Sequence, residues 1–143
     1  MSELARTIVG RLREYIGNRR HARRVRVRLP FSLSLLDLSV SRNGSRRPQS
    51  IEGHTHDISA NGLALIVPAI RIGEHYLAGE SRRLQIRLEL PGGPVEIDAS
   101  PAHYDTWEEQ SAGTEYRISV RISHMSEADR AHYNEYVTGL LHR

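Results

Sequence analysis

The chain has 143 residues, no cysteine, a formal net charge of +3, and 38% hydrophobic and 26% charged residues. These values fit one globular domain with its own core, and the absence of cysteine excludes disulfides, cysteine metal sites and cysteine nucleophiles. No apolar run approaches the roughly 20 residues that a membrane-spanning helix needs. We therefore expect a cytoplasmic protein without a membrane span.

The positive charge is concentrated at the N-terminal side. All 20 basic residues are arginine. Residues 1–50 hold 12 arginines against three acidic residues, a net charge of +9, whereas residues 51–143 carry a net charge of −6. The distribution is more informative than the total, because a GC-rich genome alone could produce an arginine bias. It predicts an anionic ligand or partner at the N-terminal side.

Residues 1–18 are predicted to form an amphipathic helix. Apolar residues recur at spacings of three and four between Ser2 and Ile16, and Gly17-Asn18 ends the pattern. Two interpretations remain open. The helix packs on the domain and closes its core, or it provides a self-association surface for a homo-oligomer.

A basic hinge follows this helix, and a polar turn further along the chain complements it. The hinge contains Arg19, Arg20, Arg23 and Arg24, and planar guanidinium groups suit phosphates and guanine edges. The turn is the segment 57–62, with sequence Asp-Ile-Ser-Ala-Asn-Gly, which offers an acceptor, a hydroxyl and a conformationally permissive glycine. Together they suggest a nucleotide ligand.

The rest of the chain up to residue 125 alternates with period two, which is typical of strands. Pro68–Ser81 is expected to be irregular, Pro101 to interrupt a strand, and Ser39–Ser50 and Trp107–Gly113 to be loops. The expected strands cover Val25–Leu29 continuing through Leu35, Ile51–Ser59, Gly62–Val67, Arg82–Leu90, Val95–Ala99 and Tyr116–Ile122. About six short strands in series favour an all-β fold, a closed or nearly closed antiparallel barrel over residues 19–125.

A second helix is predicted over residues 126–143. Ser126 and Asp129 have the spacing of a capping box, and an apolar stripe from Tyr133 to Leu141 follows them. We expect this helix to pack on one side of the barrel.

Both motifs together resemble those of the PilZ domain family. Arg20 to Arg24 has the form Arg-x-x-x-Arg, and Asp57 to Gly62 has the form Asp/Asn-x-Ser-x-x-Gly, in the family's order. The likeness extends from Arg19 to about Met125. It implies a six-stranded antiparallel barrel flanked by helices that binds the bacterial second messenger cyclic di-GMP, with the arginine segment wrapping over the ligand.

The resemblance also implies a role for each motif residue. Arg20 and Arg24 would grip phosphate and the guanine Hoogsteen edge. Asp57 and Ser59 would hydrogen-bond guanine, and Gly62 would allow a close approach of the backbone. A carboxylate that accepts from guanine N1–H and N2–H₂ would give base selectivity that charge alone cannot give.

In the PilZ domain family an arginine directly before the motif accompanies a stacked pair of cyclic di-GMP molecules, so the resemblance implies two ligands per chain with Arg19 as the further guanidinium. The physical reason is that this guanidinium offsets the repulsion of four phosphates. Arg23 is near enough to substitute for it. The chain departs from many relatives at Ser119, where they carry glycine, and at Ile122, where they carry phenylalanine. Both departures are interpreted as packing changes.

Structural alternatives exist for each candidate residue. The arginines could form a solvated basic stretch, and Asp57 and Ser59 a plain turn in which Ser59 bonds its own backbone. His54 and His56 are expected on one face of a strand with Asp57 on the other, which disfavours a metal site. Trp107 could anchor a loop or contact a partner.

The leading functional hypothesis is a non-catalytic receptor that changes its shape or its assembly when the ligand binds. The sequence contains no recognisable set of catalytic residues, and we expect neither a cofactor nor a metal site. The receptor would act on a protein effector. The alternatives are a nucleic-acid-binding barrel, disfavoured by the few aromatic side chains available for stacking, and a PilZ adaptor that binds no ligand.

Overall fold

The computed structural model describes residues 23–36, 50–79, 81–107 and 114–142. The predicted helix over residues 1–18, the hinge residues Arg19 and Arg20, and nearly all of the predicted loop 39–50 lie outside these ranges.

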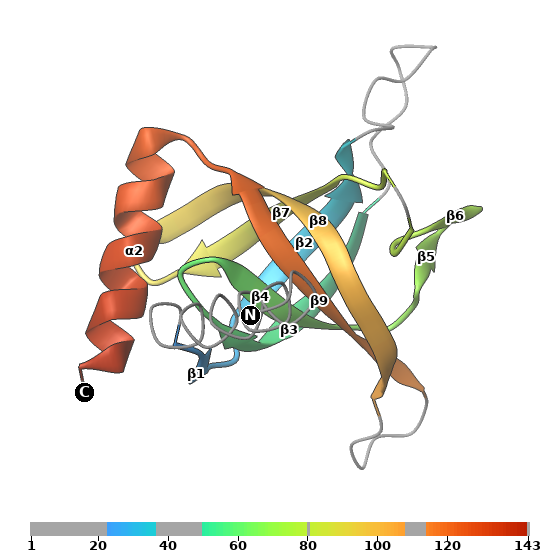
Figure 1. The fold of residues 1–143 in the computed structure, drawn as a ribbon, viewed down its shortest axis with the longest axis horizontal. Helices are drawn as coiled ribbons and strands as arrows, with labels where there is room; N and C mark the ends of the chain where they lie inside the picture. Colours follow the sequence, from blue (N-terminus) through green and yellow to red (C-terminus); the bar gives the residue numbers. More distant parts are fainter. Residues whose placement is uncertain (1–22, 37–49, 80, 108–113, 143) are drawn as a thin grey trace, which may run out of the picture.

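Six antiparallel strands form a closed barrel (Figure 1). In spatial order they are β3 (Ser50–Ile58), β2 (Pro30–Leu35), β7 (Leu84–Leu90), β8 (Gly93–Trp107), β9 (Glu115–His124) and β4 (Gly62–Val67). The pairing of β4 with β3 closes the ring, which removes the open edges of the sheet. The predicted six-stranded antiparallel barrel is confirmed.

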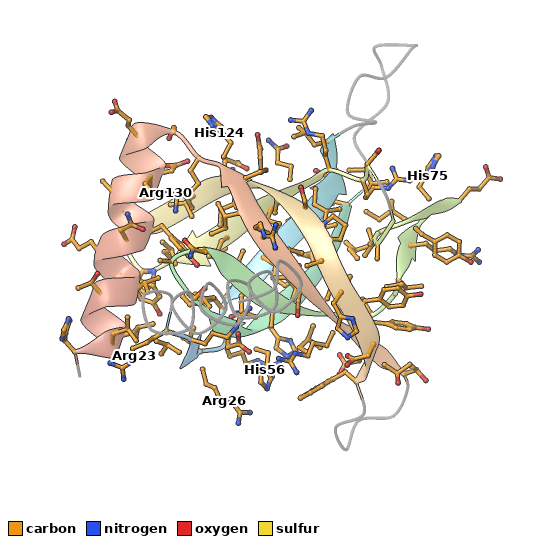
Figure 2. The ribbon with its side chains drawn as sticks, in the orientation of Figure 1. Arg23, Arg26, His56, His75, His124 and Arg130 are labelled. Atoms are coloured by element: carbon orange, nitrogen blue, oxygen red, sulfur yellow. The ribbon has the colours of Figure 1, made fainter. Side chains whose placement is uncertain are left out.

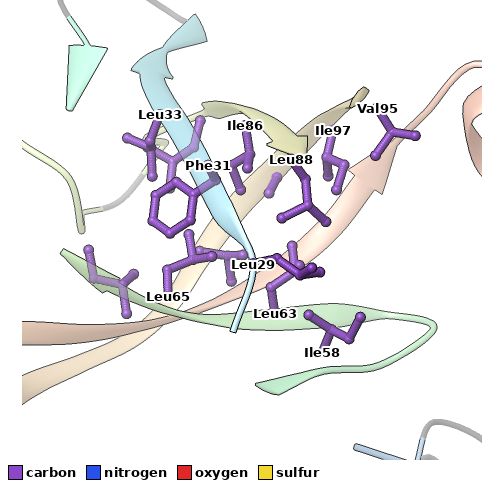
Figure 3. Close-up of a cluster of buried hydrophobic side chains, with 14 of the residues drawn as sticks. Leu29, Phe31, Leu33, Ile58, Leu63, Leu65, Ile86, Leu88, Val95 and Ile97 are labelled. Carbon is purple, nitrogen blue, oxygen red and sulfur yellow. The ribbon is translucent and has the colours of Figure 1, made fainter. Parts of the chain in front are cut away.

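The interior is filled by aliphatic side chains from alternating positions of the strands (Figure 3). Leu84, Ile86 and Leu88 of β7 are fully buried, as the period-two pattern predicts. Among the described residues, Phe31 and Tyr133 are the aromatic side chains in the buried set. The low aromatic content of the sequence therefore yields an aliphatic core.

Two local expectations were wrong. Strand β8 continues through Pro101 to Trp107, with a register shift between Pro101 and His103, because a bulge removes the need for a ladder donor at proline. The segment expected to be irregular contains a small hairpin, β5 (Arg71–Ile72) with β6 (His75–Tyr76), away from α2 in Figure 1.

The predicted first strand is broken into two pieces. The short β1 (Val25–Arg26) pairs with the end of β3, whereas β2 begins at Pro30 and pairs with the start of β3. The register of β3 differs by one residue between these two pairings, and its pairing with β4 shifts by the same amount between Thr55 and Asp57. Relative to β4, His56 is therefore an extra residue of β3, which defines a β-bulge. On the other side of β3, the segment that joins β1 to β2 holds one residue more than β3.

The side chain of Thr55 closes the gap between β1 and β2. Its Oγ1 accepts from Leu29 N at 2.9 Å and donates to the carbonyl of Val27, while Thr55 N donates to Leu29 O at 2.9 Å. The residue is 1% exposed. A buried hydroxyl thus satisfies backbone groups that the interrupted ladder leaves unpaired.

Helix α2 (Glu127–Leu141) lies across one end of the barrel (Figure 1). Ser126 is its N-cap and accepts from Asp129 N at 3.1 Å, as predicted. The Asp129 carboxylate accepts from Glu96 N of β8 at 3.0 Å, so it ties the helix to the barrel. Tyr133 and Val137 are buried in the barrel core.

Thr55→Val should lower the free energy of unfolding by about 1–3 kcal/mol, because it leaves a buried N–H and a buried carbonyl without their hydroxyl partner. Thr106→Val, at an exposed position of β8, is the matched control and should change stability by less than about 0.5 kcal/mol. Urea denaturation followed by circular dichroism measures both. Equal effects of the two substitutions would contradict the bridging role of Thr55.

Candidate functional site

The fold brings the hinge and the polar turn into direct contact. Because β1 pairs with the end of β3, Arg26 lies opposite Asp57. Arg24 Nη1 then donates to Asp57 Oδ1 at 2.7 Å, across 33 residues of sequence. The two motifs, which are separate in the sequence, therefore form one site.

The bulge at His56 places Asp57 on the outer wall of the barrel. Phe31 and Ile58 are core residues, and Phe31 pairs with Gly53, so strict alternation from Gly53 would direct residue 57 inward. The extra residue allows His56 and Asp57 to project on the same side, with His56 Nδ1 2.8 Å from Asp57 Oδ2. The expectation that these two residues face opposite sides was wrong, because a bulge breaks the period of two.

Three cationic or polar side chains surround the Asp57 carboxylate. Arg24 engages Oδ1, while His56 Nδ1 and Arg117 Nη2, the latter at 3.5 Å, engage Oδ2. The side chain of Asp57 is 6% exposed, whereas that of Arg24 is 46% exposed. A carboxylate this buried requires compensating donors, and Arg24 is the donor that solvent can reach most readily.

Arg117 and Trp107 belong to the site although the sequence analysis did not assign them to it. The Arg117 guanidinium lies 5.7 Å from the centroid of the Trp107 ring, and the His56 ring meets Trp107 edge-on at 4.8 Å. Arg117 Nε is buried and has no hydrogen-bond partner among the described residues. The alternating pattern of residues 116–122 predicts that Arg117 points out of the barrel. It does not predict that Arg117 lies next to Asp57 of β3.

The hydroxyl of Ser59 organises the turn after β3. Ser59 Oγ accepts from Asn61 N at 3.3 Å and from Gly62 N at 3.1 Å, and Ser59 N donates to Gly62 O at 2.9 Å. Ser59 is 3% exposed. In this structure the serine has the turn-forming role that the sequence analysis kept as an alternative.

Helix α2 and strand β9 hold the backbone of this turn. Tyr133 Oη donates to Ser59 O at 2.6 Å, and Arg130 Nη1 donates to Ala60 O at 3.1 Å. Ile122 N donates to Asn61 O at 2.8 Å. Burial raises the pKa of the Tyr133 phenol well above its ordinary range. The turn thus has a direct connection to the C-terminal helix.

Gly62 has a packing reason to be glycine. A Cβ at this position would lie 2.6 Å from the carbonyl oxygen of Val120 on β9, so the close approach of two strands excludes a side chain there. The hinge residue Arg23 is exposed and lies beside the C-terminal end of α2 in Figure 2. Arg19 and Arg20 lie outside the described residues.

The fold and the site together define a class: a small antiparallel barrel with a cluster of arginine, histidine and aspartate side chains on its outer wall, next to an arginine-rich N-terminal segment. The sequence model of the PilZ domain matches residues 18–139. The chain therefore belongs to the PilZ domain family, and the resemblance found in the sequence is confirmed.

Solved structures with a similar fold have low sequence identity. The PilZ domain of YcgR from Escherichia coli, solved with c-di-GMP, has a TM-score of 0.61 and 16% identity over 87% of this chain and 92% of its own. MrkH, described as a c-di-GMP-dependent transcription regulatory factor, has a TM-score of 0.59 and 15% sequence identity, and the match covers 84% of this chain and 50% of MrkH. The inhibitor of motility MotI/DgrA from Bacillus subtilis has a TM-score of 0.52 and 20% sequence identity, and the match covers 84% of this chain and 49% of MotI/DgrA. Among curated proteins, no sequence matches this chain.

The chain thus spans about half the length of MrkH and MotI/DgrA but nearly all of the YcgR domain. In the part of the chain that the structure describes, no helix has the length and apolar character needed to cross a membrane.

Tyr133→Phe should lower the free energy of unfolding at pH 7 by about 1 kcal/mol, because it removes a buried hydrogen bond to Ser59 O. Tyr104→Phe, at a residue that is 46% exposed, is the matched control and should have little effect. Thermal or urea unfolding monitored by circular dichroism measures the difference.

The same pair of variants gives a second readout at alkaline pH. The folded state holds the pKa of Tyr133 above its ordinary value of 10.0, so folding favours the neutral phenol. This contribution to stability is complete below about pH 10 and is lost as the pH rises through the folded-state pKa. Stability above pH 10 should fall less steeply in Tyr133→Phe than in Tyr104→Phe, and parallel curves would contradict the assignment.

Proposed function

We propose that this chain is a non-catalytic receptor for cyclic di-GMP that binds its ligand on the outer wall of the barrel, at the junction of the hinge and the β3 turn. Membership of the PilZ domain family supports the proposal, as does the likeness to an Escherichia coli domain solved with c-di-GMP. The main structural support for the proposal in this chain is the 2.7 Å hydrogen bond from Arg24 Nη1 to Asp57 Oδ1. This hydrogen bond places a guanidinium that can bind phosphate next to a carboxylate that can accept hydrogen bonds from guanine.

Binding would proceed by exchange of partners at Asp57. Without ligand, Arg24 neutralises Oδ1 of the buried carboxylate. With ligand, the Arg24 guanidinium turns to a phosphate or to the Hoogsteen edge of guanine, and guanine N1–H and N2–H₂ replace it at Asp57. The carboxylate keeps hydrogen-bond donors on Oδ1 in both states, and the Arg117 guanidinium stays 3.5 Å from Oδ2 to offset its charge.

His56 and Arg117 would hold Asp57 in position during this exchange. Both contact Oδ2, whereas Arg24 contacts Oδ1, so the second oxygen stays anchored when the first changes partner. A fixed carboxylate favours guanine over adenine, because adenine offers an acceptor at N1 where guanine offers a donor. Ser59 would contribute by shaping the turn, in addition to any contact with the base.

The signal would pass from the hinge to the rest of the molecule by ordering of the arginine segment over the ligand. Arg20 would join Arg24 on the ligand. The connection of the turn to α2 through Tyr133 and Arg130 offers a route to the C-terminal helix. We propose that a protein effector, or a second copy of the chain meeting it through the terminal helices, reads the change in the cytoplasm.

Arg24→Ala should weaken cyclic di-GMP binding at least about tenfold, since a charge-assisted hydrogen bond contributes on the order of 1.5–3 kcal/mol. Stability should fall by only about 1 kcal/mol, because the Arg24 side chain is 46% exposed and His56 and Arg117 still contact Asp57 Oδ2 in the variant. Arg87→Ala, which removes an exposed arginine paired with Glu89 and Glu96, is the control and should bind normally. Isothermal titration calorimetry measures affinity, and urea denaturation measures stability.

The same titration separates the competing functions. Equal affinity in wild type and Arg24→Ala would remove Arg24 from the site. A random oligonucleotide that binds more tightly than cyclic di-GMP would favour a nucleic-acid-binding barrel, and a folded chain that binds neither would favour an adaptor.

The proposed stoichiometry is two ligands per chain, stacked and held with the help of Arg19. Arg19→Leu should lower the number of ligands bound at saturation from two towards one, because it removes the guanidinium that offsets phosphate repulsion. Calorimetric titration at protein concentrations far above the dissociation constant gives this number directly. Arg71→Leu, which removes an exposed arginine on β5, should leave it at two. A wild-type value of one would make Arg19 a solvated neighbour of the site.

A further inference from the structure

A second cationic site lies next to Asp57, outside both sequence motifs. It is a pocket of about 280 Å³ on the outer wall, and its polar lining consists mainly of Arg26, Arg28, His54 and His56. Arg26 and His56 lie on the same side of the barrel in Figure 2. His56 belongs both to this pocket and to the cluster around Asp57, because it lines the pocket and contacts the Asp57 carboxylate.

The pocket is a consequence of the break between β1 and β2. Its remaining lining residues are Val27, Thr55 and Ile66, and Thr55 is the buried residue that bridges the break through Val27 and Leu29. Hydrogen bonds of Thr55 to Leu29 N and to the Val27 carbonyl therefore hold part of the pocket lining in place.

The charge of the pocket is not balanced by its own lining. Among the described residues that line it, two are arginines, two are histidines and none is acidic. Asp57 lies opposite Arg26 in the register, but its two oxygens engage Arg24, His56 and Arg117. Guanidinium groups in such a setting bind phosphate well, since they can donate two parallel hydrogen bonds to it.

We propose that this pocket is a phosphate-binding subsite, with Arg26 and Arg28 as the main donors and His54 and His56 beside them. Its volume of about 280 Å³ lies just below the range of roughly 300–1,000 Å³ that is typical of small-molecule sites, which suits one phosphate with part of its sugar rather than a complete dinucleotide. The phosphate belongs to cyclic di-GMP bound at Arg24 and Asp57, an assignment that rests on the proposed function, or to a separate small phosphate compound.

The test uses the full chain and two double variants with the same change in charge. Arg26→Gln with Arg28→Gln removes both guanidiniums from the pocket. Arg71→Gln with Arg87→Gln removes two exposed arginines that do not line it. Amide NMR spectra establish that each variant is folded and record the response to inorganic phosphate at Thr55 and His56. Calorimetry records the affinity for cyclic di-GMP.

We expect inorganic phosphate to shift the Thr55 and His56 amide signals in the wild type and in the control, but not in the pocket variant. Affinity for cyclic di-GMP should fall at least about tenfold in the pocket variant and less than about twofold in the control. A selective loss of cyclic di-GMP affinity, with or without phosphate shifts, supports the subsite as part of the dinucleotide site. Phosphate shifts with unchanged cyclic di-GMP affinity support the subsite for a separate phosphate compound.

The subsite is overturned if phosphate causes no selective shift and the two double variants lose cyclic di-GMP affinity equally or not at all. Equal losses would mean that diffuse positive charge, rather than the pocket, attracts the ligand. Failure of the proposed function is a distinct result. If the wild type does not bind cyclic di-GMP, that function is wrong, and the response to phosphate alone then decides whether the pocket binds anions.

Discussion

The two halves of β3 are out of phase by one residue, and the fold accommodates this offset at His56. The first half must direct Gly53 towards the core beneath Phe31, where a Cβ would lie 2.2 Å from the carbonyl oxygen of Ile66. The second half must direct Ile58 into the core. A bulge satisfies both requirements, and it also brings His56 and Asp57 together on the outer wall. The break between β1 and β2, which Thr55 bridges, lies beside the same point of β3, where the β1–β2 segment holds one residue more than β3.

The buried carboxylate of Asp57 links the architecture to the proposed chemistry. Its donors come from three separate parts of the chain: the hinge, β3 itself and β9. Removing one of them without replacement would leave charge poorly compensated in a largely buried place. In the proposed exchange at Arg24, guanine would supply hydrogen-bond donors in place of the guanidinium and so reduce this cost. In the proposed site, ligand binding would therefore occur together with the release of the Arg24–Asp57 ion pair.

The turn after β3 is rigid for reasons unconnected with a ligand. Ser59 Oγ satisfies two backbone N–H groups, Tyr133 and Arg130 hold two carbonyls from α2, and Gly62 allows β9 to approach closely. Residues of the Asp-x-Ser-x-x-Gly motif thus have structural roles that precede any contact with a base. A turn held in this way would lose little conformational freedom if a ligand bound to it. Its carbonyls are connected to α2 through Tyr133 and Arg130.

The sequence by itself determined the all-β class, the positions of most strands, the cap of α2 and the two motifs that placed the chain in its family. These features depend on local periodicity and local residue chemistry, which neighbouring residues encode. The tertiary structure alone decided that Asp57 contacts Arg24, that Arg117 and Trp107 join the site, that Tyr133 holds Ser59, and that a cationic pocket opens beside them. These contacts depend on strand register. Because the bulge that sets the register arises from core packing demands at opposite ends of β3, no local pattern in the strand reveals it.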